Sequence, residues 1–98
     1  LMDHEIGNDE REKIANIVST HPDTIGYHDL RTRRSGTRVF VQLHLELDAA
    51  LTLAAAHAIA DKVEKDIAAL FVDAEVMIHE DPVNSDHPND DIQVGNEI

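Results

Sequence analysis

The sequence predicts an α+β fold: an α-β-β-α-β sandwich of the ferredoxin-like kind, one strand short, with a three-stranded sheet and two helices on one face. Two stretches carry apolar residues at helical spacing, and three stretches alternate apolar with polar residues as strands do. At 98 residues the chain is long enough for one domain with its own core. Aromatic residues make up only 3% of the chain, so this core must be aliphatic.

The first predicted helix begins at Asn8, a residue suited to capping a helix and followed by acidic residues that complement the helix dipole. Ile14 and Val18 follow at helical spacing. Pro22 disfavours helical geometry in the residue before it, so the helix is expected to end near Thr20.

Two strands, at residues 27–34 and 38–47, are predicted to form a β-hairpin with Ser35 and Gly36 in its turn. The second strand alternates most clearly, and its alternation places His44 on the face opposite the core.

The first strand is harder to assign to faces. Strict alternation groups His28 with Leu30, although Leu30 has the character of a core residue. Two interpretations stay open: His28 lies in a bend where the strand begins, or the assumed alternation is wrong.

A long alanine-rich helix is predicted over residues 51–70, followed by a third strand over residues 73–79. The strand pattern places His79 and Asp81 on one face, and Pro82 is expected to end the strand. The helix should pack on the sheet through a stripe formed by Ala56, Ile59, Ala60, Val63, Ile67 and Leu70.

The composition limits the partners of the chain. Eight basic and twenty acidic residues give a formal net charge of −12, which disfavours nucleic acid as a partner and favours cations. The chain has no cysteine, so any metal must be held by its seven histidines and its carboxylates. No apolar run is long enough to span a membrane.

We expect three regions along the chain. Residues 1–7 are predicted to be a linker, and residues 8–82 a single domain. Residues 83–98 are acidic with no basic residue among them, and we expect them to be a disordered tail in which His87 at most binds divalent ions loosely.

The pattern indicates a metal site on the open face of the sheet. His79 and Asp81 lie two residues apart at a strand end, which alone is also typical of a solvated turn. His44 on the same face adds a second imidazole, and two imidazoles with a carboxylate match what Zn²⁺ accepts in a tetrahedral site. His28 would complete the set.

A separate pair, His57 and Asp61, lies at i, i+4 on one helix face, where it can chelate a metal or form a surface hydrogen bond. If the helices cover one face of the sheet, His57 lies a layer away from the other histidines. It could join their site only from another subunit. Asp61 and Glu80 are candidates for a supporting role.

Catalysis is not indicated by any motif. The sequence contains no GxSxG, P-loop or GxGxxG pattern, so we predict that the chain is not an enzyme. A hydrolytic metal site would need an open coordination position in a cleft, which a sequence cannot show.

Four short segments keep a fixed order and spacing along the chain. They are HDLRTR at residues 28–33, QLHLE at residues 42–46, AHAIAD at residues 56–61 and IHEDP at residues 78–82. Together they closely resemble the cytoplasmic C-terminal domain of the cation diffusion facilitator family, bacterial proton-coupled exporters of Zn²⁺ and related metals. The resemblance covers about residues 1–82.

The resemblance implies a homodimer at the cytoplasmic face of the cell membrane, continuous with a transmembrane transport domain. It implies metal ligands at His28, His44, His79 and Asp81, with Asp81 as a bridging carboxylate and His57 supplied by the neighbouring subunit. Zn²⁺ is the first expectation, with Cd²⁺, Fe²⁺ and Mn²⁺ as alternatives. The hypothesis is a regulatory metal-sensing domain, and the alternative is a metal-independent module for dimerisation or small-ligand binding.

Overall fold

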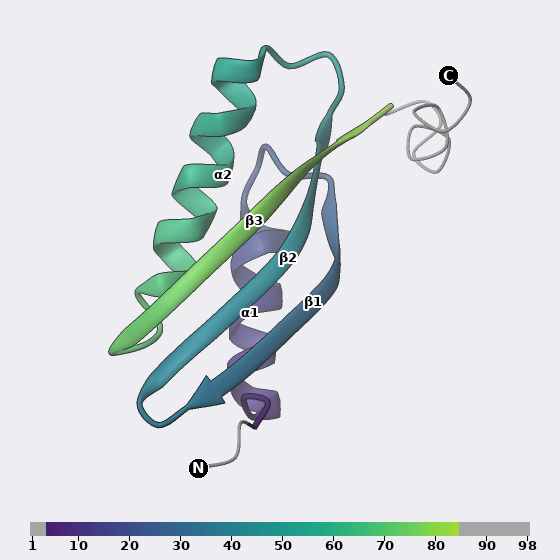
Figure 1. Ribbon diagram of the computed structural model, residues 1–98. Helices are drawn as coiled ribbons and strands as arrows, with labels where there is room; N and C mark the ends of the chain where they lie inside the picture. Colours follow the sequence, from purple (N-terminus) through teal and green to yellow (C-terminus); the bar gives the residue numbers. More distant parts are fainter. Residues whose placement is uncertain (1–3, 85–98) are drawn as a thin grey trace, which may run out of the picture.

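The structure, a computed structural model, describes residues 4–84 of the chain, and its α-β-β-α-β order confirms the predicted fold. Both helices lie on one face of a three-stranded sheet (Figure 1). Neither helix in this region is long and apolar enough to cross a membrane. Most of the predicted tail, including His87, lies outside the described residues. The elements are α1 (Asn8–Thr20), β1 (Gly26–Ser35), β2 (Arg38–Asp48), α2 (Leu53–Ala68) and β3 (Asp73–Val83).

The sheet has the order β1-β2-β3, with β2 in the centre. β1 pairs antiparallel with β2 through the predicted hairpin, and β3 pairs parallel with β2 after the crossover through α2. The central strand contributes every second residue to the core, as its alternation predicts. These residues are Val39, Val41, Leu43, Leu45 and Leu47, each at most 2% exposed.

Both helices pack on these residues through apolar stripes. α1 buries Ile14 and Val18, and the segment before it adds Ile6 to the same cluster. The prediction that Leu70 belongs to the stripe of α2 is wrong: its exposed fraction is 37%, because the helix ends at Ala68. The buried residues of α2 are Ala60, Val63 and Ile67.

The helix ends differ from the predicted ones by one or two residues. Gly7, and not Asn8, is the capping residue of α1, because the Gly7 N–H donates to the Glu10 carboxylate over 3.2 Å. α2 begins after Thr52, whose hydroxyl accepts a hydrogen bond from the Ala55 N–H over 3.1 Å.

β3 is longer than the predicted range 73–79: Pro82 does not stop the strand, which continues to Val83. Pro82 pairs with Leu47 of β2 in unbroken parallel register. An edge strand tolerates proline because a missing N–H on its outer side takes no hydrogen bond from the sheet. The longer strand keeps Asp81 within the sheet, where its position is set by the register with Glu46.

A β-bulge in β1 resolves the conflict between His28 and Leu30. His28 pairs with His44, whereas Arg31 pairs with Gln42, so β1 holds one residue more than β2 between these pairs. Both pairs lie on the open face, and Leu30 packs against the core. The assumption of strict alternation was therefore wrong at this position.

An ion pair between Glu10 and Arg34 ties the start of α1 to the end of β1, with 2.8 Å between Nη2 and Oε2. The hydrogen bond from Arg34 and that from the Gly7 N–H lower the pKa of Glu10. A carboxyl whose pKa is lower in the folded state stabilises the protein above its unfolded pKa and loses this effect as the pH falls through the folded pKa. The pair therefore stabilises the fold at neutral pH and not in acid.

Replacing Glu10 with glutamine is expected to lower the free energy of unfolding at pH 7 by at most about 1 kcal/mol, since both side chains are about one third exposed and water screens the pair. Glutamine keeps the capping contact with Gly7 but loses the negative charge and one of the two hydrogen bonds from Arg34, because its amide nitrogen cannot accept. Urea unfolding at pH 7 and at successively lower pH measures the effect, and the difference should shrink as the pH falls through the lowered pKa of Glu10. Glu12→Gln on the exposed side of the same helix is the control, and an equal loss there would contradict the prediction.

Candidate metal centre

Three histidines lie side by side across the open face of the sheet, one on each strand. In the register of the strands, His44 of β2 is the partner of both His28 and His79. The rings stack: the centroids of His28 and His44 are 4.9 Å apart, and those of His44 and His79 are 4.7 Å apart. The three rings form a continuous row, which we call the histidine row.

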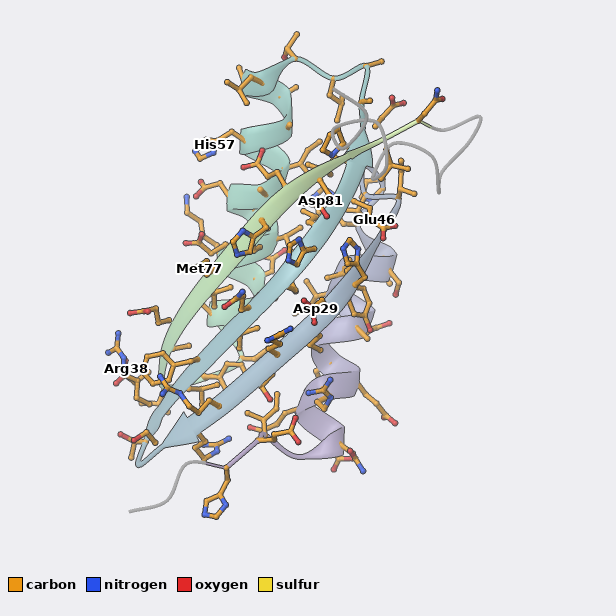
Figure 2. All side chains as sticks on the ribbon, turned by 45° about the vertical axis from the view of Figure 1, so that its right-hand side comes forward. Asp29, Arg38, Glu46, His57, Met77 and Asp81 are labelled. Atoms are coloured by element: carbon orange, nitrogen blue, oxygen red, sulfur yellow. The ribbon has the colours of Figure 1, made fainter. Side chains whose placement is uncertain are left out.

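Asp81 lies next to the histidine row and contacts two of its members. One carboxylate oxygen lies 3.2 Å from Nε2 of His28, and both lie 3.2 Å from Nδ1 of His44. One ligand atom from each of these three residues lies within 4.8 Å of the others, close enough for one ion to contact all three. Figure 2 shows Asp81 over the sheet, near Glu46 of the neighbouring strand.

Two further carboxylates flank the row, and neither was singled out from the sequence. Glu46 Oε2 lies 2.7 Å from Nδ1 of His28, and Asp29 Oδ2 lies 3.9 Å from Nε2 of His44. Glu46 follows His44 by two residues on the same strand and therefore lies on the same face, so alternation could have identified Glu46. Asp29 reaches the row through the bulge, for which the sequence carries no comparable signal.

Arg31 holds the Asp29 carboxylate through a hydrogen bond of 3.1 Å from its Nε to Oδ1. This hydrogen bond, together with the positive charge of the guanidinium, lowers the pKa of Asp29. Asp29 is therefore ionised at neutral pH and faces His44 as an anion.

His79 stacks on His44 but lies at the margin of the group. It is exposed, and its Nε2 lies 3.4 Å from the side-chain amide nitrogen of Gln42. Its ring does not join the set of His28, His44 and Asp81, whose ligand atoms converge. Whether His79 binds metal stays a prediction.

His57 lies on α2, and the structure does not bring it to the row. Its side chain is 75% exposed, and Nδ1 lies 3.6 Å from an oxygen of Glu80, the second of the two candidate supporting carboxylates. The other, Asp61, does not pair with His57: it contacts Lys65 over 3.0 Å and raises the pKa of that lysine. Figure 2 shows His57 projecting from α2, away from Asp81 and Glu46.

The donor set fits a divalent transition metal. Two imidazoles and one carboxylate are ligands that Zn²⁺ and its neighbours accept, and the set contains no sulfur. Because the three side chains are between 25% and 38% exposed, the ligand atoms are open to solvent and to further ligands. The centre is therefore a surface site at which another chain could supply a donor.

The comparisons with known proteins agree with this chemistry. Residues 6–83 match the family model described as the cytoplasmic domain of cation efflux proteins. The cation-efflux pump FieF of Yersinia enterocolitica is 49% identical over 82 residues, covering 84% of this chain. The match spans only 27% of that protein's length.

Two solved structures share the fold. The metal-bound C-terminal domain of the CzcD transporter from Thermotoga maritima is 29% identical, with a TM-score of 0.70 over 76% of this chain and 87% of that one. CzrB, which is described as a zinc transporter, is also 29% identical, with a TM-score of 0.72 over 79% of this chain and 96% of that one.

Proposed function

This chain belongs to the family of cytoplasmic domains of cation efflux proteins, and from that premise we propose that it is the regulatory, metal-sensing part of a proton-coupled zinc exporter. The observation that carries the proposal is the convergence of His28, His44 and Asp81, whose ligand atoms lie within 4.8 Å of one another. Metal binding at this centre would bias the conformation of a dimer and so promote export when the cytoplasmic metal concentration rises.

The proposed ligand residues lie on the paired strands of the sheet. His44 lies on the central strand, and the flanking strands hold His28 and Asp81 in hydrogen-bonded register with it. A site on strands is pre-organised, so little ordering of the chain opposes binding. In the proposal, His79 and the partner's His57 complete the ligand set.

The dimer is proposed from charge and from the position of His57. Two chains with a formal charge of −12 repel each other, and a bound divalent cation would cancel part of this repulsion while ligands from both subunits hold it. His57 is well exposed on α2 and lies apart from the row of its own chain. An exposed histidine in this position suits a donor to a neighbouring subunit.

Zn²⁺ is the metal we propose, with Cd²⁺, Fe²⁺ and Mn²⁺ as alternatives. Imidazole and carboxylate donors suit zinc, and the related structures include a metal-bound transporter domain and a protein described as a zinc transporter. Equilibrium dialysis against zinc and then against the alternatives tests the proposal directly. Stoichiometric uptake is expected. Its absence for every metal would instead favour a metal-independent module that uses the open sheet face.

Replacing His57 with alanine is expected to abolish the zinc-induced approach of two subunits while leaving zinc binding to each chain largely intact. The reason is that the row and Asp81 belong to one chain, whereas His57 would reach the centre only from the other. Because the chain has no cysteine, Lys13→Cys on the exposed side of α1 provides a single site for a spin label. Inter-label distances measured with and without zinc report the approach.

His4→Ala is the control for this experiment, since it also removes an exposed histidine but leaves α2 unchanged. It should show the full zinc-induced change in distance. A full change in His57→Ala as well would remove His57 from the bridging role.

A further inference from the structure

The bulge in β1 consists of one residue that the sheet does not need. If Asp29 were absent, His28 would remain on the open face, Leu30 would take the next inward position, and Arg31 would again face outward. The faces of all three would be the same as they are now. The extra residue therefore serves neither the core nor the placement of His28.

Asp29 also adopts a conformation that most residues avoid. Its φ is 55°, in the left-handed region, and it is the only residue other than glycine with a positive φ in the described part of the chain. Bulges and strained residues of this kind are concentrated at functional sites, where they redirect a side chain. Here the redirected group is a carboxylate, held by Arg31 and facing Nε2 of His44.

Glu46 faces the ring of His28 as Asp29 faces the ring of His44. Its carboxylate lies 2.7 Å from Nδ1 of His28, while Nε2 of the same ring lies 3.2 Å from Asp81. His44 has the opposite orientation, with Nδ1 toward Asp81 and Nε2 toward Asp29. Each ring thus has one nitrogen directed at the shared carboxylate and the other at a carboxylate outside it.

We propose that Glu46 and Asp29 are positioning residues that determine which ring nitrogen of His28 and His44 is available to a metal. This inference rests on the proposed metal-sensing function. Metal-bound histidines generally donate their other N–H to a carboxylate or carbonyl, which sets the tautomer and the orientation of the ring. Glu46, at hydrogen-bond distance, retains the Nδ1 proton of His28 and leaves Nε2 free. The Asp29 carboxylate lies 3.9 Å from Nε2 of His44, too far for a hydrogen bond, and its negative charge favours the proton on that nitrogen, which leaves Nδ1 free.

The tautomer of His28 is a direct readout in the metal-free protein. At about pH 8.5, above the usual titration range of histidine, ring ¹⁵N chemical shifts distinguish the protonated nitrogen from the bare one. We expect the proton of His28 on Nδ1. Glu46→Gln keeps an acceptor oxygen and should preserve this tautomer, whereas Glu46→Leu removes the acceptor and should shift the proton to Nε2. A proton on Nε2 in the unsubstituted chain, or no change in Glu46→Leu, would overturn the role of Glu46.

The role of Asp29 in the bulge is tested by measuring the stability of the fold and the zinc affinity separately. Asp29→Gly removes the carboxylate and relieves the left-handed backbone, so the thermal midpoint should stay the same or rise. Zinc affinity should fall by about 10- to 100-fold, the usual cost of losing an outer partner of a ligand. Asp29→Asn keeps a residue that tolerates this backbone and should lower the affinity similarly. Asp23→Asn removes one exposed charge away from the row and should leave the affinity unchanged.

The outcomes separate this inference from the function on which it rests. If the unsubstituted chain takes up neither zinc nor any of the three alternative metals, both are wrong. If the unsubstituted chain binds zinc and the affinity is the same in Glu46→Leu and Asp29→Asn, only the positioning role is overturned. A fall in affinity with an unchanged or higher thermal midpoint in Asp29→Gly supports the inference, because the loss of a merely structural residue would lower both.

Discussion

Replacing Asp81 with asparagine is expected to lower the affinity for zinc by at least about a hundredfold, a larger loss than the 10- to 100-fold typical of outer partners. Asp81 is the one carboxylate of the converging group, and it lies 3.2 Å from a ring nitrogen of His28 and 3.2 Å from one of His44. Asparagine retains the shape of the side chain but loses its negative charge. The centre would then consist of two neutral imidazoles without an anionic donor.

Calorimetric titration with zinc measures both the affinity and the stoichiometry of this variant. Asp73→Asn is a matched control on the same strand, since Asp73 pairs with Arg38 over 3.0 Å and lies at the opposite end of β3. The control should bind zinc as the unsubstituted chain does. If Asp81→Asn retained its affinity and stoichiometry, the convergence of the three side chains would not be a metal site.

Replacing Leu43 with alanine is expected to lower the free energy of unfolding by about 2–5 kcal/mol. Leu43 is fully buried in the centre of β2, where the strand packs against both helices. The substitution removes apolar contact and leaves a cavity that the surrounding strands can close only in part. For a chain of this size such a loss is a large part of the total stability.

Urea unfolding followed by circular dichroism provides the measurement. Leu53→Ala makes the same chemical change at a side chain that is 82% exposed on the first turn of α2, so its effect should remain within about 0.5 kcal/mol. Equal losses of unfolding free energy in the two variants would mean that Leu43 does not lie in the hydrophobic core.

Much of the fold could be predicted from the sequence because its patterns are local. The alternation in β2 is unbroken over the strand, and the stripe of α2 is correct at Ala60, Val63 and Ile67. The errors lie at the ends of helices and strands, where a single contact decides at which residue the element begins or ends. Gly7 replaces Asn8 as the cap through its hydrogen bond to Glu10, and β3 continues through Pro82 because the strand lies at the edge of the sheet.

The candidate site was predicted in part, for the same reason. Alternation places His44, His79 and Asp81 on one face without any knowledge of tertiary structure. Alternation failed at His28 because β1 holds one extra residue. That residue can be recognised only from the pairing of β1 with β2, in which it has no partner. Asp29 was missed with it, since its role depends on that bulge.

By itself, the sequence of this protein determined the order of its elements, the face on which each regular strand carries its polar residues, and the absence of any thiolate ligand. These properties follow from periodicity and composition, which act within a few residues. Only the tertiary structure decided that Asp81 contacts two imidazoles, that Glu46 and Asp29 lie behind them, and that His57 remains outside the group. Those relations depend on the register between strands and on the layer to which each element belongs, and both are set by packing between distant parts of the chain.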